Sequence, residues 1–275
     1  MKTIVGHALF PELTYANDGH SRLQRFVIEA IETLAGRNRL ASLYDSWRRE
    51  VVPSGDAMFQ KMLAMVGIEL RLSGTWPPSL PDTPLVMVAN HPFGIADGIA
   101  ILSLAERLGR PFRVMIHSDL LKVEEMRPYA LPIDFSDTRE AMANNLAVRH
   151  EAVALLRQGV TIVIFPAGGV STAARGFGKA QDLPWKTFAA RLVKDARASV
   201  MPLYFSGQNS LLFHLATRVS MTLRLSLLVP EFVRRMGKPI DVTIGRIIPA
   251  DALAELDDRK AILQTVHRAV FSLAK

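Results

Sequence analysis

The 275-residue sequence contains no cysteine. Disulfide bonds, thiolate nucleophiles and Cys-ligated zinc are therefore excluded, and a reducing compartment is compatible with the chain. A metal site is not expected either. His7, His20, His150, His214 and His267 do not have the spacing of metal ligands in the sequence.

Long apolar runs are missing too. No stretch of about 18 apolar residues occurs, so a membrane-spanning helix is not expected. The first seven residues lack the apolar stretch of a signal peptide, which favours a cytoplasmic location.

Acidic residues are too few to balance the basic ones. The 33 Lys and Arg residues against 26 Asp and Glu give a net charge of +7, and the mean hydropathy is positive, at +0.17. Together these favour docking on an anionic membrane surface. Nucleic acid is not expected as a partner, because the sequence has no RNP-like, zinc-finger or basic-helix signature.

A proline-rich stretch at 75–84 divides the sequence into two parts. Before it, residues 1–80 are expected to form an N-terminal helical region. The expected elements are a helix capped by Asn17 or Asp18 and ended by Gly36, a helix over Leu40–Glu50, a helix capped by Ser54 and reaching Met65, and a strand over 68–72.

After this stretch, over 81–275, strand-like and helix-like segments alternate. This pattern predicts an α/β domain with a central mixed, mostly parallel sheet flanked by helices on both faces. Strands are expected at 85–89, 112–116, 160–165, 200–205 and 240–245, and helices at 97–108, 138–157, 185–197, 209–217 and 257–273.

The first strand of this domain leads into a histidine followed by an aspartate, His91 and Asp97. Ligands of open α/β sheets bind at such strand ends. The carboxylate of Asp97 can accept from one imidazole nitrogen and leave the other as a general base. Gly94 and Gly98 allow the tight backbone that this needs. The alternative is that Asp97 caps a helix and His91 is a packing residue.

A second loop, Pro166–Ser171, follows the apolar segment 160–165. Gly168 and Gly169 can present backbone N–H groups to an anion or a developing oxyanion, and Arg175 and Lys179 follow within reach. An ordinary glycine-rich turn with solvated cations is the alternative. The sequence has no P-loop spacing and no Gly-x-Ser-x-Gly elbow of a serine hydrolase.

The two loops together resemble the PlsC-like lysophospholipid and glycerolipid acyltransferase superfamily. The resemblance rests on Asn90-His91 with Asp97, on Phe165-Pro166-Ala167-Gly168 with Ser171, and on the segments Val200–Tyr204 and Gly207–Ser210. It is closest to the ornithine-lipid and haemolysin-like O-acyltransferase branch, which also has five residues between His and Asp, and covers about residues 80–250.

The resemblance implies a glycerolipid acyltransferase-like fold and a peripheral membrane O-acyltransferase on the inner face of the cell membrane. It would move a fatty acyl group from acyl-ACP or acyl-CoA to the hydroxyl of a lysolipid, such as lyso-ornithine lipid or lysophosphatidic acid, without an acyl-enzyme and without a further cofactor. His91 would be the general base and Asp97 would orient it. The implied substrate-binding residues are Asn90, Phe93, Gly94, Gly168, Gly169, Ser171, Arg175, Lys179 and Arg139.

Two departures from the family pattern leave an alternative open. The Glu of the third block is replaced by Ala167, and no Glu stands at Gly169 either. A non-catalytic member that binds lipid or acyl carrier protein would fit these changes. Membrane contact is expected from the apolar and basic segment 210–235 and from the basic N-terminal helices; the alternative is that both are amphipathic helices packed on the sheet.

Overall fold

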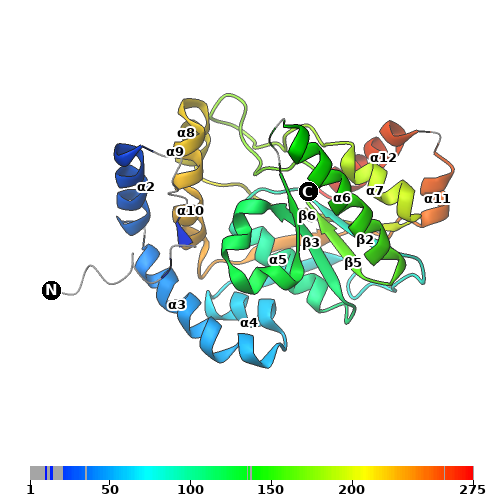
Figure 1. The fold of residues 1–275 in the computed structure, drawn as a ribbon, viewed down its shortest axis with the longest axis horizontal. Coiled ribbons are helices and arrows are strands. Elements are labelled where there is room, and N and C mark those ends of the chain that lie inside the picture. Colours follow the sequence, from blue (N-terminus) through cyan, green and yellow to red (C-terminus); the bar gives the residue numbers. More distant parts are fainter. Residues whose placement is uncertain are drawn as a thin grey trace.

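A computed structural model of the chain describes residues 10, 13–14, 21–34, 36–134, 136, 138–256 and 258–274. Within this part, a seven-stranded sheet lies between two layers of helices (Figure 1). The predicted α/β fold with a mixed, mostly parallel sheet is confirmed. Asn17 and Asp18, the predicted caps of the first helix, lie outside the described residues.

The sheet has the strand order β1-β7-β6-β2-β5-β3-β4. Its strands are β1 (Leu70–Gly74), β2 (Leu85–Ala89), β3 (Phe112–His117), β4 (Ala130–Ile133), β5 (Thr161–Ile164), β6 (Ser199–Phe205) and β7 (Ile240–Ile244). All neighbours are parallel except β6 and β7, where Leu203 lies opposite Ile244. Since β2 is central, its carboxyl end lies between those of β5 and β6.

The buried strands divide their side chains between two hydrophobic clusters, as the alternation of a strand requires. In β2, Leu85, Met87 and Ala89 join the cluster that contains helices α3, α4 and α5. Val86 and Val88 join the cluster that contains α6, α7 and α12. All five residues are at most 1% exposed, which explains the continuous apolar sequence.

The helices differ from the prediction mainly after β6. The single helix expected at 209–217 is followed by two more, because Ser220 and Leu227 interrupt the segment 211–235. Helix α11 was not predicted. The described helices are α2 (Arg22–Leu34), α3 (Arg37–Glu50), α4 (Met58–Met65), α5 (Ile95–Glu106), α6 (Arg139–Arg157), α7 (Phe188–Ala196), α8 (Leu211–Val219), α9 (Met221–Ser226), α10 (Leu228–Arg235), α11 (Ala250–Ala254) and α12 (Arg259–Phe271).

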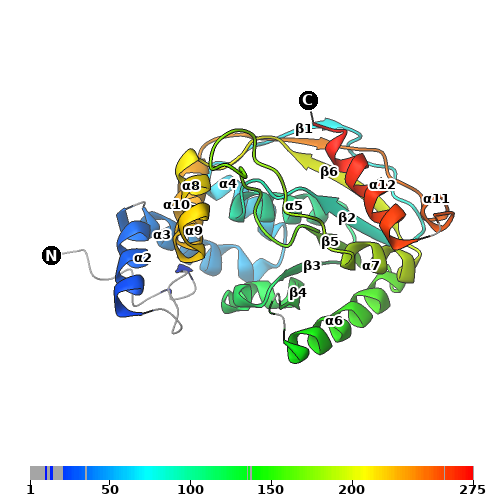
Figure 2. The ribbon, with the colours of Figure 1, turned by 90° about the horizontal axis from the view of Figure 1, so that it is seen from above.

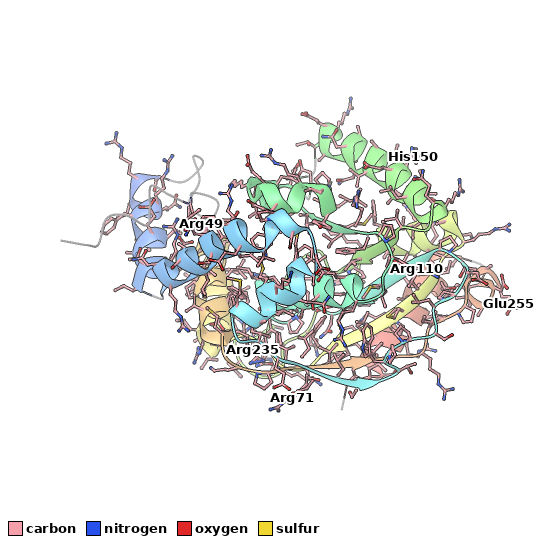
Figure 3. The ribbon with its side chains drawn as sticks, turned by 90° about the horizontal axis from the view of Figure 1, so that it is seen from below. Arg49, Arg71, Arg110, His150, Arg235 and Glu255 are labelled. Atoms are coloured by element: carbon pink, nitrogen blue, oxygen red, sulfur yellow. The ribbon has the colours of Figure 1, made fainter. Side chains whose placement is uncertain are left out.

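The strand from the N-terminal region is part of the main sheet. β1 pairs along its length with β7 and forms one edge, where the exposed Arg71 lies at the rim of the molecule (Figure 3). Helices α3 and α4 share a hydrophobic cluster with the sheet. The division of the chain at residue 80 stays a prediction.

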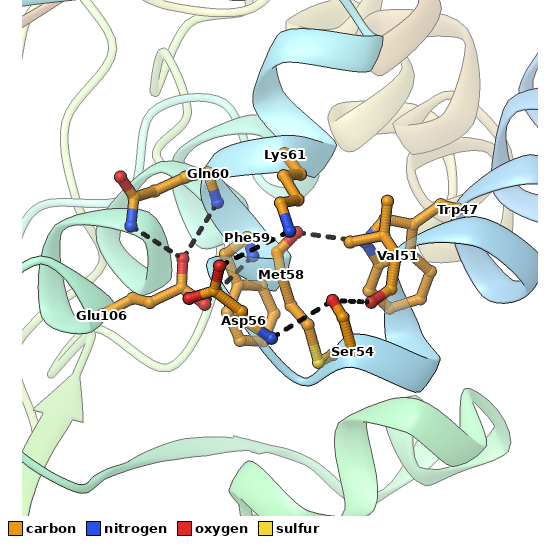
Figure 4. A network of polar contacts seen from close by, with 9 residues as sticks. All are labelled: Trp47, Val51, Ser54, Asp56, Met58, Phe59, Gln60, Lys61 and Glu106. Carbon is orange, nitrogen blue, oxygen red and sulfur yellow. Dashed lines mark hydrogen bonds and ion pairs between the residues drawn. The ribbon is translucent and has the colours of Figure 1, made fainter.

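Polar contacts join α3, α4 and α5 (Figure 4). The buried Trp47 donates its indole N–H to the carbonyl of Met58 at 3.0 Å. The carboxylate of Glu106 accepts the backbone N–H groups of Phe59 and Gln60, which satisfies the open end of α4. The predicted cap at Ser54 is therefore wrong: α4 begins at Met58, and a residue of another helix provides its acceptor.

Helices α2, α8 and α9 lie side by side at one end of the molecule (Figures 1 and 2). None of the helices in the described ranges is long and apolar enough to cross a membrane.

Candidate active site

The turn between β2 and α5 brings His91 and Asp97 together. The Nδ1 atom of His91 lies 2.9 Å from Oδ1 of Asp97. The Asp97 side chain is fully buried, whereas that of His91 is 17% exposed. The imidazole therefore has one nitrogen against a buried carboxylate and keeps limited access to solvent.

The same carboxylate holds the turn in place. Its Oδ2 accepts the backbone N–H of Phe93 at 2.7 Å. Gly94 has φ 79° and ψ −105°, a conformation that requires glycine, and it precedes α5. Asp97 is therefore not the N-cap; it lies in the first turn of the helix and reaches back. Gly98 sits in α5 with no positive φ, so the expectation that it shapes the turn is wrong.

Asn90 joins the ends of two strands. Its side-chain amide donates to the carbonyl of Phe205 at 2.9 Å and accepts the N–H of the same residue at 2.7 Å. Because both ends of this buried carboxamide are engaged at β6, Asn90 fixes the position from which His91 emerges. Its predicted contact with substrate stays a prediction.

The second predicted loop meets the first directly. The N–H of Ser171 donates to the carbonyl of His91 at 2.7 Å, and the ring of Phe165 stacks on the imidazole with centroids 4.0 Å apart. Gly168 adopts φ 67°, and its N–H closes a turn onto Phe165. The structure thus brings together the two loops that the sequence analysis paired.

Asp182 joins both loops and was missed by the sequence analysis. Its Oδ1 accepts the backbone N–H of His91 at 3.2 Å and the hydroxyl of Ser171. Its Oδ2 accepts the indole N–H of Trp185 at 2.9 Å. Asp182 stands in an irregular segment with no periodicity or motif, so no signal in the sequence could have identified it.

The buried side chain of Arg224 holds the second loop in place. Arg224 is 7% exposed and donates to the carbonyl of Val170 at 2.6 Å. Burial lowers the pKa of its guanidinium. Arg224 is one of the basic residues of the segment 210–235, for which membrane contact was expected; for this residue the expectation is wrong, because the side chain points into the protein.

A buried histidine also contacts the end of this loop. His214 is 1% exposed, and its Nδ1 accepts the N–H of Ala173 at 3.4 Å. Burial lowers the pKa of His214, which favours the neutral imidazole that can act as an acceptor.

The remaining predicted substrate residues lie on the surface. Arg175 and Lys179 are exposed in the segment between Ser171 and Asp182, which is held against α8 by the contact from Arg218 to the carbonyl of Ala174. Arg139 is exposed at the start of α6. In the described part of the chain, none of the three makes a hydrogen bond or ion pair with His91 or Asp97.

Comparison with known proteins gives relatives that are acyltransferases. The chain is 23% identical over 273 residues to a lyso-glycine lipid O-acyltransferase of Phocaeicola vulgatus, covering 94% of this chain and 92% of the relative. It is 29% identical over 183 residues to a lyso-glycine lipid O-acyltransferase of Bacteroides thetaiotaomicron, covering 62% and 63%.

Among solved structures, the fold is similar to that of PlsC, the 1-acyl-sn-glycerophosphate acyltransferase from Thermotoga maritima. The TM-score is 0.50 at 15% identity, with 98% of this chain and 87% of that chain covered. Residues 78–248 match the model of the family described as Acyltransferase, a range that includes both loops and Asp182. The chain therefore belongs to this acyltransferase family and has a PlsC-like fold.

Proposed function

We propose that this acyltransferase moves a fatty acyl group from acyl-ACP or acyl-CoA to the hydroxyl of a lysolipid. The observation that carries the proposal is the contact between Nδ1 of His91 and the buried carboxylate of Asp97. A lyso-glycine lipid joins lyso-ornithine lipid and lysophosphatidic acid as candidate acceptors, because the curated relatives are named for it.

In the proposed mechanism, Nε2 of His91 takes the proton of the acceptor hydroxyl. The oxygen attacks the thioester carbonyl, and the tetrahedral intermediate collapses to an ester and a thiolate, which receives the proton from the imidazolium. Asp97 holds the proton of Nδ1 and stabilises the positive charge while it exists. Acyl transfer then needs no acyl-enzyme, and a general base of this kind contributes about 10²–10⁴-fold to the rate.

The oxyanion would be stabilised by backbone N–H groups of the second loop. The N–H groups of Gly168 and Ser171 already donate to Phe165 and His91. The N–H groups of Ala167, Gly169 and Val170 make no hydrogen bond within the described residues, but Ala167 and Val170 are buried, so Gly169 is the candidate donor. Gly169 is partly exposed, so a substrate carbonyl can approach it.

Membrane contact is proposed for the surface of α2 and α8, named here the α2–α8 surface. Its exposed apolar side chains are Leu23 and Phe26 of α2 and Leu211, Leu212, Leu215 and Val219 of α8, together with Met221 at the start of α9 and Phe177 of the segment held against α8. Leu23 of α2 is 72% exposed and Val219 of α8 is 73% exposed, and both helices pack against α9 (Figure 2). Large apolar side chains gathered at such exposure favour insertion at a membrane interface, here the inner face of the cell membrane.

The proposed function is tested by incubating the full chain with acyl-ACP or acyl-CoA and each of the three lysolipids in vesicles. Free thiol and newly acylated lipid are measured together. The proposal predicts that both form in equal amounts and only when an acceptor is present. Thiol release without acceptor would instead indicate a thioesterase, and lipid binding without turnover would indicate a binding protein.

A further inference from the structure

A pocket of about 280 Å³ lies where α10 ends beside the segment that follows β6. It is lined by residues from three parts of the chain: Phe93, Gln208, Asn209, Ser210, Leu211, Glu231, Arg234, Arg235 and Lys238. Phe93 is also part of the catalytic turn, since its N–H is bound by Asp97. One wall of this pocket is therefore two residues from the proposed base.

Arg235, the last residue of α10 (Figure 3), is one of the cationic residues that line this pocket. Its guanidinium carbon lies 4.1 Å from the centroid of the Phe93 ring. The side chain is half-buried, and its Nε is fully buried with no hydrogen-bond partner among the described residues. Within the described ranges, no carboxylate forms an ion pair with Arg235. A half-buried cation without a counter-ion is unfavourable, so a ligand that supplies negative charge would be stabilised there.

The one carboxylate in the pocket wall is already engaged. Glu231 is 8% exposed and accepts both the N–H and the hydroxyl of Ser210. Arg234 lies 3.9 Å from it. The charges of Glu231 and Arg234 therefore offset each other, and Arg235 and Lys238 remain as two positive charges without an ion pair in the part of the chain that the structure describes.

The positive charge of Arg235 also interacts with Asp97, one of the two residues of the proposed catalytic pair. Burial lowers the pKa of its guanidinium, and the charges of Asp241 and Asp97 act in the opposite direction. The cation is thus within electrostatic range of the carboxylate that orients His91. A group bound by Arg235 would lie next to the reaction centre, separated from it by the ring of Phe93.

We propose that this pocket binds an anionic group, a phosphate or a carboxylate, of one of the two substrates, with Arg235 and Lys238 as the cationic residues. A volume of about 280 Å³ holds such a group with a few neighbouring atoms rather than a whole ligand. The guanidinium offers the bidentate geometry that phosphate and carboxylate prefer. That this anionic group belongs to a substrate rests on the proposed function.

Both proposed substrates carry an anionic group that could bind in this pocket. The acyl donor has the phosphate of its phosphopantetheine arm, and the lysolipid has its headgroup. Steady-state kinetics with Arg235→Gln and Lys238→Gln distinguish them. A KM for the donor that rises about 10- to 100-fold, the loss expected for a charge-assisted hydrogen bond, assigns the pocket to the donor. The same rise for the lysolipid alone assigns it to the acceptor. Unchanged KM values for both substrates would overturn the proposal.

A binding measurement keeps this test separate from catalysis. The thermal unfolding midpoint of the wild type is recorded against inorganic pyrophosphate, with sodium chloride at equal ionic strength as the reference. We expect a rise that is lost in Arg235→Gln and reduced in Lys238→Gln. Arg191→Gln, which removes an exposed charge on α7, should keep the full rise.

The two variants also separate binding from packing. Arg235→Gln removes a contact with Phe93, whereas Lys238 is exposed and its replacement leaves that contact intact. An equal pyrophosphate response in the wild type and both variants would contradict an anion site. If the wild type transfers no acyl group but shows the predicted response, the proposed function fails and the anion site stands.

Discussion

The imidazole of His91 and the carboxylate of Asp97 are joined by a single 2.9 Å contact, between Nδ1 and Oδ1. The other carboxylate oxygen is occupied by the N–H of Phe93. Asp97 consequently contacts the imidazole and shapes the turn that carries it, and these two effects can be separated by substitution.

Asp97→Asn should reduce kcat by about 10²–10⁴-fold while leaving the turn intact. The amide oxygen can still accept from Phe93, but its NH₂ group then faces Nδ1 of His91. Nδ1 must become an acceptor, so the proton moves to Nε2 and the base is lost. The measurement is acceptor-dependent thiol release, with the unfolding midpoint as the control. A fall in kcat below about threefold would contradict the assigned role.

Gly94→Ala should destabilise the protein by about 1–3 kcal/mol and lower activity. A Cβ atom at this left-handed position would lie 3.1 Å from Leu228 and 3.2 Å from Val170. The matched control is Gly98→Ala in α5, which has open space around it and should be neutral or stabilising by about 0.5–1 kcal/mol. Chemical denaturation measures both; equal effects would show that the turn tolerates a side chain at residue 94.

Asp182→Asn should lower kcat more than it raises KM. An asparagine has one acceptor oxygen, so it can accept either from His91 and Ser171 or from Trp185, and the contact that joins the two loops to Trp185 is lost. We expect a decrease in kcat of about 10- to 100-fold, since small displacements of reacting groups have effects of this size. Asp251→Asn, in α11, is the control on the surface. An unchanged kcat with a lower unfolding midpoint would mean that Asp182 only stabilises the fold.

Leu212→Glu on the α2–α8 surface should weaken binding to anionic vesicles. Leu212 is 61% exposed, and transferring a leucine into an apolar layer is worth about 1.5–3 kcal/mol, or roughly a 10- to 100-fold change in partition. Met142→Glu in α6 introduces the same charge at a residue with 61% exposure on a different helix and should bind as the wild type does. Co-sedimentation measures both; equal losses would place the membrane contact elsewhere or make it unspecific.

The pairing of His91 with Asp97 could be predicted from the sequence because the two residues are close in the chain. Six positions separate His91 from Asp97, and an apolar segment indicated that a buried strand ends just before them. Asp182 could not be found in this way, since its contact with His91 joins residues 91 positions apart. The same holds for Arg235 and Phe93, which meet only because α10 packs beside the turn.

Two expectations from the sequence were wrong because contacts with distant parts of the chain decide the local structure. No strand was expected at 130–133, yet Ala130–Ile133 forms β4. Pro132 is tolerated there because β4 is an edge strand with β3 as its one partner in the sheet. Similarly, the basic pattern of 210–235 suggested exposed arginines, but the packing of α9 buries Arg224 beneath the second loop.

The most direct test of the central claim is acceptor-dependent thiol release by the wild type and by His91→Ala, under conditions in which both bind vesicles equally. The account predicts a fall in kcat of at least about 100-fold in the variant, the loss expected when a general base is removed. The same kcat in both proteins would contradict it, because the proton of the acceptor hydroxyl would then be taken by another group.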